Sequence, residues 1–336
     1  MGIRRTVAGR ILVTGANGFV GSALCRLLQD SGCPVRGAVR ETARCSSHDR
    51  STHDGIEWVV LHDQSGEEET RQKLRGVEVI VHLAARVHVM TDTSADPLHA
   101  FRKVNVAWTE RLARAATAEG VRRFVYMSSI KVNGEQSMVP FTERDSPNPQ
   151  DPYGLSKWEA EQALATVSSQ TGLETVVIRS PLVYGPGVGG NFLQLLHVLG
   201  KGIPLPLAGV ENRRSLVYRE NLVDALSRCV HDKVATGQTY LVSDGEDLST
   251  PELIRRLGKA LGVSVRLWPL PFSILGGIGQ LIGKQLVVDR LLTSLPVDSS
   301  KIRKELDWHP PFSVDQGLDA TVTWFRARTT NRVMAS

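Results

Sequence analysis

A glycine-rich turn directly after a short apolar segment is the feature that most constrains the fold of this chain. The segment Arg10–Thr14 reads R-I-L-V-T, and its apolar run predicts a buried strand. Gly15, Gly18 and Gly21 follow, and a helical pattern continues beyond them. Glycine permits a tight turn, close approach of a pyrophosphate and close packing of helix on strand, and a helix N-terminus offers free N–H groups to phosphates. The turn therefore predicts a dinucleotide site; the alternative is an ordinary strand-to-helix turn.

Apolar segments and helical patterns alternate along most of the chain. Strands are predicted at Arg10–Thr14, Val35–Val39, Ile56–Leu61, Val77–His82, Arg123–Ser128, Glu174–Arg179 and Gln238–Ser243. The clearest helical patterns are Pro97–Glu119 and Pro152–Thr171. Parallel strands joined by right-handed helical crossovers form a doubly wound sheet. The predicted fold class is therefore α/β, with a Rossmann-type doubly wound parallel sheet.

Beyond Tyr184 the alternation gives way to segments rich in glycine and proline, which predict a smaller, discontinuous C-terminal substrate lobe. The predicted parts are a Rossmann domain at 8–183 plus 220–245, a substrate lobe at 184–219 plus 246–328, and a flexible tail at 329–336. The charged segment 41–55 is predicted to be a mobile loop. The apolar segment 267–288 contains prolines and a lysine, so it predicts a packed helix rather than a membrane span, with contact to a membrane surface as the alternative.

Composition limits the partners of the chain. A formal net charge of +5 over 336 residues suits an anionic ligand, whereas no basic run with interleaved aromatic residues indicates nucleic acid. Cys25, Cys33, Cys45 and Cys229 lack metal-type or redox-type spacing and are predicted to be reduced thiols. The segment Met1–Gly9 has no long apolar core of the kind found in signal peptides. We therefore expect a cytoplasmic protein without a metal site or integral membrane association.

A tyrosine and a lysine four residues apart predict proton transfer. Tyr153 and Lys157 share one face of the helix predicted at Pro152–Thr171. A free phenol titrates near pH ~10, and a nearby ammonium favours the phenolate. Together with the positive nicotinamide ring of an oxidised cofactor, Lys157 would make Tyr153 a general acid or base near neutral pH. Combined with the glycine turn, the pair predicts hydride chemistry on an alcohol or a ketone; the alternative is a solvated helix face.

These motifs resemble those of the extended short-chain dehydrogenase/reductase family, which contains nucleotide-sugar epimerases, dehydratases and reductases. Besides the glycine turn, the resemblance rests on H-L-A-A at His82–Ala85, S-S-I-K-V-N-G at Ser128–Gly134, P-Y-G-L-S-K at Pro152–Lys157, R-S-P-L-V-Y-G-P-G at Arg179–Gly187, N-R-R-S-L-V at Asn212–Val217 and D-S-S-K…L-D-W-H-P from Asp298 to Pro310. It implies dinucleotide contacts from Gly15, Asn17, Gly18, Phe19, Val20, Gly21, Asp63, Leu83, Ala84, Ala85, Tyr153, Lys157 and Pro181. It also implies a homodimer built from the helices predicted at Pro97–Glu119 and Pro152–Thr171.

The end of the second predicted strand bears on the choice of cofactor. NAD-binding proteins usually place an acid there for the ribose hydroxyls, whereas this strand ends in Val39 and Arg40. Because an arginine can hold a 2′-phosphate, the sequence favours NADP(H). NAD(H) is the alternative, since Glu41 follows immediately and Arg40 could be a solvated strand end.

The family resemblance also bears on the reaction. It places the active-site hydroxyl at Ser129, with Ser128 as the alternative. Sugar 4,6-dehydratases carry an Asp-Glu pair at the next two positions, where this chain has Ile130 and Lys131. The remaining reactions, 4-ketoreduction and 4-epimerisation, need only a hydride and one proton. Lys131 is predicted to face the sugar nucleotide, because strand alternation would place it on the same face as Ser129; a solvated lysine is the alternative.

The resemblance is strongest to bacterial UDP-sugar 4-reductases and 4-epimerases of surface-polysaccharide synthesis, and in particular to 4-ketoreductases that form UDP-N-acetylquinovosamine. It implies UDP-sugar contacts from Asn191 and Arg214, whereas Leu182 replaces the family's usual asparagine. The predicted function is NAD(P)H-dependent reduction of a UDP-linked 2-acetamido-4-keto-6-deoxyhexose. The alternatives are a UDP-sugar 4-epimerase with tightly bound NAD and a redox-sensing protein of the same fold without turnover.

Overall fold

A computed structural model of the protein describes residues 9–41, 55–87, 96–271 and 291–334, together with positions 274 and 289. Its main element is a seven-stranded sheet in the order β3-β2-β1-β4-β5-β6-β9, with every pair of neighbours parallel. The strands are β1 (Arg10–Thr14), β2 (Val35–Val39), β3 (Glu57–Val60), β4 (Val77–His82), β5 (Arg123–Ser129), β6 (Glu174–Ser180) and β9 (Thr239–Leu241). The strand order reverses between β1 and β4, and ligands of doubly wound sheets bind at the carboxyl ends of the strands at such a point.

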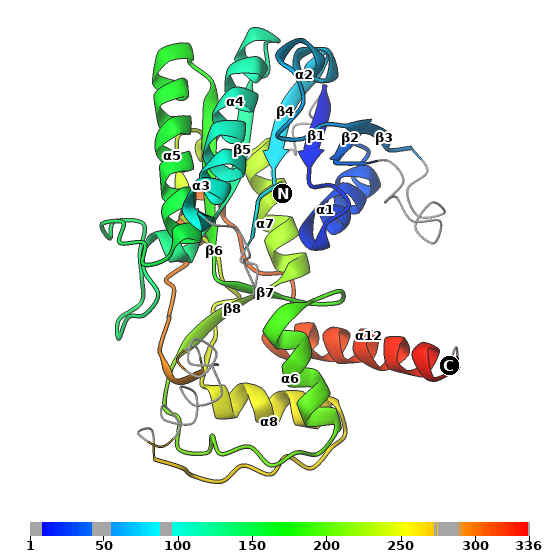
Figure 1. The fold of residues 1–336 in the computed structure, drawn as a ribbon, viewed down its shortest axis with the longest axis vertical. Coiled ribbons are helices and arrows are strands. Elements are labelled where there is room, and N and C mark those ends of the chain that lie inside the picture. The colour runs from blue at the N-terminus through cyan, green and yellow to red at the C-terminus, as the bar shows by residue number, and fades with distance from the viewer. Residues whose placement is uncertain are drawn as a thin grey trace.

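Helices cover both faces of the sheet, as Figure 1 shows. One face packs against α1 (Phe19–Asp30), α7 (Arg219–His231) and α11 (Ser300–Leu306), and the other against α2 (Glu67–Leu74), α4 (Trp108–Ala118) and α5 (Pro152–Thr171). In β1, Ile11 and Val13 join the first core and Leu12 joins the second. Burial on both faces explains why these strands are continuous apolar runs rather than alternating ones.

The long helix predicted at Pro97–Glu119 is interrupted by a π-helical turn. The structure has α3 (Pro97–Arg102), the π-helical segment Lys103–Ala107 and α4. Asn105 lies in this segment, and its buried side chain binds the backbone of Arg86 through both its oxygen (2.8 Å) and its nitrogen (3.0 Å). Such bulges often occur near functional sites, and this one braces the loop that follows β4.

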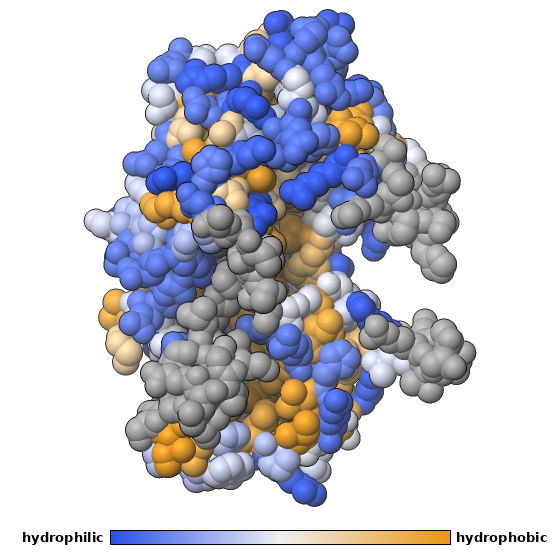
Figure 2. Space-filling view, viewed as in Figure 1, coloured by the Kyte–Doolittle hydropathy of each residue, from blue (hydrophilic) through white to orange (hydrophobic). Residues whose placement is uncertain are grey.

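A second group of elements lies beyond the carboxyl ends of the strands, in the lower part of Figure 1. A three-stranded sheet has the order β10 (Asp247–Leu248), β8 (Arg214–Tyr218) and β7 (Leu182–Tyr184). Together with α6 (Gly190–Gly200), α8 (Thr250–Ala260) and α12 (Val314–Met334) it encloses a third apolar core. Figure 2 shows a hollow between this lower part and the sheet above, with apolar surface visible inside it.

The structure differs from the sequence predictions at the ends of several strands and helices. The third strand is shorter than the predicted Ile56–Leu61, and the last shorter than the predicted Gln238–Ser243. The sequence predicts a flexible tail at 329–336, whereas α12 continues as a helix to Met334. Most of the segments 41–55 and 267–288 lies outside the described residues, as does Cys45, while Cys25, Cys33 and Cys229 are free. Among the helices that the structure describes, none has the length and apolar character needed to cross a membrane.

Candidate active site

The glycine turn between β1 and α1 is held by close backbone packing. Gly15 adopts a left-handed conformation with φ of 66°, and a Cβ there would lie 3.1 Å from the backbone nitrogen of Ala84. A Cβ on Gly21 would lie 2.1 Å from the carbonyl oxygen of Gly15. Both positions therefore require glycine, one for its conformation and one for the close approach of helix to turn.

The start of α1 is open to an anion. Gly18 is the N-cap residue, and both it and Asn17 are exposed. The N–H groups of Phe19, Val20 and Gly21 belong to the first turn, where a helix provides no acceptors of its own. This first turn contains no acidic residue that would compete for these donors. The geometry fits the pyrophosphate of a dinucleotide.

Enlarging Gly21 tests this fit. Gly21→Ala should displace the turn, because the nearest atom to the added Cβ is a backbone oxygen at 2.1 Å. Overpacking of this kind costs roughly 1–3 kcal/mol, so we expect affinity for NAD⁺ or NADPH in calorimetric titration to fall about ten- to a hundredfold. Gly66→Ala is the control, since no atom lies within 4 Å of its added Cβ. Unchanged affinity in Gly21→Ala would show that the dinucleotide does not use this turn.

A directed chain of hydrogen bonds connects β1, β4 and the π-helical segment. The Thr14 hydroxyl oxygen accepts from the backbone N–H groups of Leu83 and Ala84, each at 3.1 Å. Its proton then points to Nδ1 of His82 at 2.7 Å, and Nε2 of His82 lies 3.0 Å from the Thr109 hydroxyl. Because the Thr109 hydroxyl donates to a backbone carbonyl, His82 must donate from Nε2 and is neutral. Burial lowers the pKa of His82 to about 3, with a smaller contribution from the Lys157 charge.

The stability of the fold should depend on pH through His82. The unfolded chain takes up a proton near the ordinary pKa of 6.5, whereas the folded chain does so only near about 3. Stability should therefore fall as pH drops through this interval, by at most about 1.4 kcal/mol per pH unit. In urea unfolding, His82→Gln should show a shallower loss of stability over the same interval. An equal slope in both proteins would contradict the assignment of a neutral buried His82.

Helix α5 presents Tyr153 and Lys157 beside the end of β5. The helix begins at the N-cap residue Asp151, whose Oδ1 accepts from the Gly154 N–H at 2.6 Å. The Lys157 ammonium donates to the carbonyl oxygen of Met127 at 2.8 Å and lies 5.9 Å from the centre of the Tyr153 ring. The helix face predicted from the spacing of four is therefore the one that packs on β5.

The two serines at the end of β5 have different environments. The Ser128 hydroxyl is buried and donates to Oε1 of Glu161. Ser129 is half-buried, and its hydroxyl accepts from the backbone N–H of Lys131 at 3.3 Å. A hydrogen bond with Ser129 also lowers the pKa of Tyr153. Because Ser128 is engaged inside the fold, Ser129 is the serine that faces Tyr153.

The protein's own groups do not bring the Tyr153 pKa to neutrality. Burial raises it, and the negative charge of Asp151 raises it further. Burial also lowers the pKa of Lys157 to about 7, against the raising effect of Glu161. The sequence prediction relied on Lys157 together with the positive ring of a bound oxidised cofactor, whereas within the protein alone burial penalises the charged forms of both Tyr153 and Lys157.

Lys131 does not occupy the place that strand alternation predicts. Strand β5 ends at Ser129, and Ile130–Val132 form a 3-10 turn, so the alternation does not extend to Lys131. Its ammonium instead forms ion pairs with Asp151 and with Glu135, the latter at 2.7 Å. The sequence argument placed Lys131 on the same strand face as Ser129. That placement is wrong, because the strand ends before Lys131.

The remaining predicted dinucleotide contacts surround the carboxyl edge of the sheet. Arg40 is exposed at the end of β2, and Asp63 is half-buried after β3. Leu83, Ala84 and Ala85 are half-buried directly after β4, and Pro181 is buried between β6 and β7.

The predicted substrate contacts lie in the lower part of the molecule. Asn191 is in the first turn of α6, and its buried Oδ1 has no hydrogen-bond partner among the described residues. Arg214 begins β8 and donates from Nη1 to the carbonyl oxygen of Thr293 at 3.0 Å. Its neighbour Arg213 is exposed and pairs with Asp247 at 3.0 Å. An orphaned buried acceptor such as Asn191 Oδ1 is the kind of atom that a ligand would satisfy.

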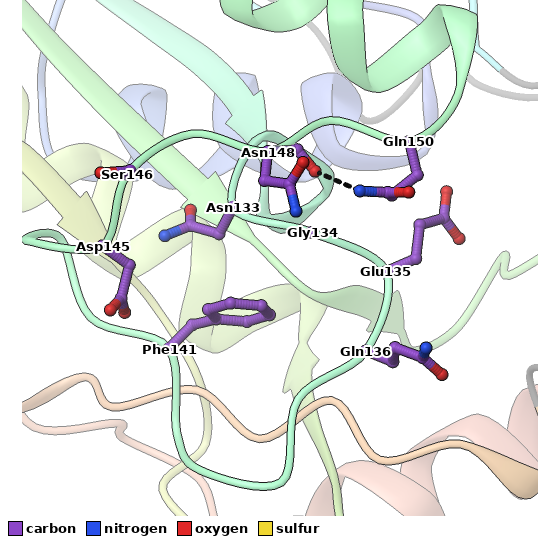
Figure 3. A pocket seen from close by; sticks show the side chains of 9 residues that line it. All are labelled: Asn133, Gly134, Glu135, Gln136, Phe141, Asp145, Ser146, Asn148 and Gln150. Carbon is purple, nitrogen blue, oxygen red and sulfur yellow. Dashed lines mark hydrogen bonds between the residues drawn. The ribbon is translucent and has the colours of Figure 1, made fainter.

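A cavity of about 530 Å³ lies beside the loop that follows β5 (Figure 3). Its lining includes Asn133, Glu135, Phe141, Asp145 and Gln150. Two of its polar groups are already partnered within the protein: Asn133 donates to the Thr142 carbonyl at 3.0 Å, and Asp145 accepts from the Thr142 N–H at 2.6 Å. We therefore place the candidate site at the glycine turn and Tyr153 rather than in this cavity.

A family model matches most of the chain. The model of the NAD dependent epimerase/dehydratase family matches residues 11–243. The matched segment is more than half of the chain and contains the glycine turn, Ser129, Tyr153 and Lys157. The chain belongs to the NAD dependent epimerase/dehydratase family.

Relatives of this chain differ in the reactions they are named for. A UDP-glucose 4-epimerase of Vibrio cholerae is 42% identical over 325 residues, covering 96% of this chain and 97% of that protein. A 3-beta-hydroxysteroid dehydrogenase of Mycolicibacterium neoaurum is 29% identical over 351 residues, covering 96% and 92%. The structure of UDP-glucuronic acid 4-epimerase from Bacillus cereus in complex with NAD aligns with a TM-score of 0.77 at 22% identity, covering 95% of this chain and 99% of that one, and this likeness shows the fold.

Several residues that organise the site of this epimerase/dehydratase family member were not identified from the sequence. His82 is visible there only as part of H-L-A-A, and nothing near it in the sequence indicates its hydrogen bonds to Thr14 and Thr109. Glu161 lies one helical turn beyond Lys157 and forms a buried ion pair with Arg179 at 2.6 Å. Its spacing of four from Lys157 is the signal that could have found it, because this spacing puts Glu161 on the same face of α5 as Tyr153 and Lys157.

Proposed function

We propose that the protein is a nicotinamide-dependent enzyme that acts at carbon 4 of a UDP-linked hexose. The observation that carries this proposal is the grouping of Ser129, Tyr153 and Lys157 at the carboxyl end of β5, two strands away from β1 and its glycine turn in the sheet. The positions where the dehydratase pattern needs two carboxylates hold a buried isoleucine, Ile130, and Lys131, which is tied to Asp151. This arrangement provides for one proton transfer and lacks the groups for a second one at carbons 5 and 6.

The residues of the chain would divide the chemistry as follows. The Tyr153 phenol gives a proton to the reacting oxygen or takes one from it, and the Ser129 hydroxyl holds that oxygen in place. The Lys157 ammonium, fixed by the Met127 carbonyl, favours the ionised phenol when charged. The nicotinamide dinucleotide, when bound, supplies hydride transfer.

We assign each part of a dinucleotide to residues at the carboxyl edge of the sheet. The first turn of α1 would bind the pyrophosphate, Asp63 the adenine, and Arg40 or Glu41 the adenosine ribose or its phosphate. Leu83, Ala84, Ala85 and Pro181 would line the path from the glycine turn to Tyr153. On the substrate side, the orphaned Asn191 Oδ1 and the Arg214 guanidinium would bind the uridine diphosphate sugar.

The first candidate reaction is UDP-sugar 4-epimerisation. It is supported by the Vibrio cholerae relative, which is named UDP-glucose 4-epimerase and aligns over 96% of this chain. The second candidate is 4-ketoreduction of a UDP-2-acetamido-4-keto-6-deoxyhexose. It is supported by exposed Arg40 at the end of β2, where an acid is usual in NAD-binding proteins.

Cofactor retention and turnover distinguish these candidates. An epimerase should be purified with NAD bound and should interconvert UDP-glucose or UDP-N-acetylglucosamine with its C4 epimer without added reductant. A reductase should be purified without dinucleotide and should oxidise NADPH only when a UDP-4-keto sugar is added. Absence of both activities in a folded protein that binds dinucleotide would reject the proposal and favour a redox sensor. The homodimer stays a prediction, which light scattering tests.

A further inference from the structure

Three charged side chains meet beside the first turn of α5, the helix that carries Tyr153 and Lys157. The Lys131 ammonium contacts the Asp151 carboxylate and lies 2.7 Å from Oε1 of Glu135. The side chains are 19%, 22% and 31% exposed for Lys131, Asp151 and Glu135, so solvent screens them only in part. Attraction to Lys131 favours the ionised form of Asp151, whose pKa is lowered from its ordinary value by this lysine and by the Gly154 N–H against the raising effect of burial.

Asp151 has two consequences for the catalytic helix. As the N-cap residue of α5, it fixes the first turn by accepting from the Gly154 N–H at 2.6 Å. Its charge also lies two residues before Tyr153, where a negative charge opposes loss of the phenolic proton. Asp151 therefore opposes loss of the Tyr153 proton to the extent that its own charge is not offset by a neighbouring cation.

We propose that Lys131 is a positioning residue for the reaction: it offsets part of the Asp151 charge, so that this carboxylate caps α5 while opposing proton loss at Tyr153 less than an unpaired carboxylate would. Lys131 acts through Asp151 and does not contact the substrate. This inference rests on the proposed function of Tyr153. It replaces the direct contact to the sugar that the sequence suggested for Lys131.

The other groups around Tyr153 do not offset the charge of Asp151. Lys157, on the same helix, is bound to the Met127 carbonyl and lies 5.9 Å from the Tyr153 ring centre. From β5, Ser129 is uncharged, and burial holds the pKa of Tyr126 well above its ordinary value, so that phenol is neutral. From α3, Phe101 packs edge-on at 6.0 Å and carries no charge. Among these neighbours in the described part of the chain, Asp151 is the anion that raises the Tyr153 pKa, and Lys131 is its partner.

The test follows the ionisation of Tyr153 without requiring turnover. Phenolate absorbance is titrated in the presence of saturating NAD⁺, and the curve of Tyr153→Phe is subtracted from that of the wild type. The same subtraction is made for Lys131→Met, for Asp151→Asn and for the double variant, each against its own Tyr153→Phe form. Asparagine caps helices about as well as aspartate, so Asp151→Asn removes the charge and keeps the cap.

We expect the Tyr153 midpoint to rise by roughly one pH unit in Lys131→Met, as for an uncompensated neighbouring charge. It should return to the wild-type value or below in Lys131→Met/Asp151→Asn. The exposed Lys304→Met serves as a control and should leave the midpoint unchanged. A wild-type Tyr153 that does not titrate below the range of an ordinary phenol would instead reject the proposed function.

Two other outcomes would overturn the role of Lys131 while leaving the proposed function intact. One is an unchanged midpoint in Lys131→Met. The other is a raised midpoint that Asp151→Asn does not restore, because the effect would then not pass through Asp151. In steady-state kinetics, a KM for the UDP-sugar that rises in Lys131→Met with an unshifted pH profile would likewise show a direct substrate contact.

Discussion

Replacing Tyr153 by phenylalanine should reduce turnover by a factor of order 10² to 10⁴, the usual contribution of a positioned acid-base group. The substitution removes the hydroxyl and keeps the ring, whose edge-on packing against Phe101 at 6.0 Å should persist. Dinucleotide affinity should change little, because the glycine turn and the start of α1 are untouched. Steady-state kinetics and calorimetric titration of the same preparation measure both quantities.

A second tyrosine provides the matched control. Tyr240, on β9, has a hydroxyl that donates to Glu305 at 3.0 Å, far along the chain from the catalytic helix. Tyr240→Phe removes a bonded hydroxyl in the same way and should leave turnover nearly unchanged. Near-normal turnover in Tyr153→Phe, or equal losses in both variants, would exclude Tyr153 as the proton-transfer group.

Breaking the buried ion pair between α5 and β6 should have the largest effect on stability. Arg179 and Glu161 are each only 5% exposed and lie 2.6 Å apart. Glu161 also accepts from the Ser128 hydroxyl, and Arg179 also donates to Asn133 at 2.9 Å. Removing one member leaves an uncompensated buried charge, which costs roughly 3–5 kcal/mol. We therefore expect Arg179→Met to lower the free energy of unfolding, measured with urea, by about this amount.

The double variant separates loss of the pair from loss of packing. Arg179→Met/Glu161→Met removes both charges, and apolar replacements of a buried pair are often tolerated. It should therefore recover much of the stability, although the Ser128 hydroxyl still loses its partner. Arg114→Met, which breaks an exposed pair with Glu110, should cost only a few tenths of a kcal/mol. A double variant less stable than Arg179→Met would contradict the ion-pair argument.

The sheet could be predicted from the sequence because its strands are buried on both faces. The predicted bounds Arg10–Thr14, Val35–Val39 and Val77–His82 match the structure, as does the helix Pro152–Thr171. The helix bounds follow from local signals, an N-cap aspartate followed by proline at one end and Gly172 with φ of 76° at the other. These elements are set by residues near one another in the chain.

One part that sequence reasoning missed is a local turn, and the others depend on residues far apart in the chain. Strand alternation predicts the face of Lys131 correctly only if β5 continues, but the Ser129 hydroxyl accepts from the Lys131 N–H and begins a 3-10 turn. The π-helical segment likewise follows from the bonds between Asn105 and the Arg86 backbone, nineteen residues earlier. The Thr14–His82 bond joins residues 68 positions apart. No local pattern contains the pairings of Asn105 with Arg86 and of Thr14 with His82.

We propose that the protein carries out redox and proton chemistry at carbon 4 of a UDP-sugar and nowhere else on the ring. The most direct test is NMR of the product formed in deuterated water from UDP-glucose, UDP-N-acetylglucosamine or, with NADPH, a UDP-4-keto-6-deoxy-N-acetylhexosamine, each with an enzyme-free control. We predict that the product differs from the substrate only at carbon 4 and carries no solvent deuterium on carbon beyond the control. Enzyme-dependent deuterium at carbon 5 or 6 would contradict this proposal, because it would require the second proton transfer for which Ile130 and Lys131 provide no carboxylate.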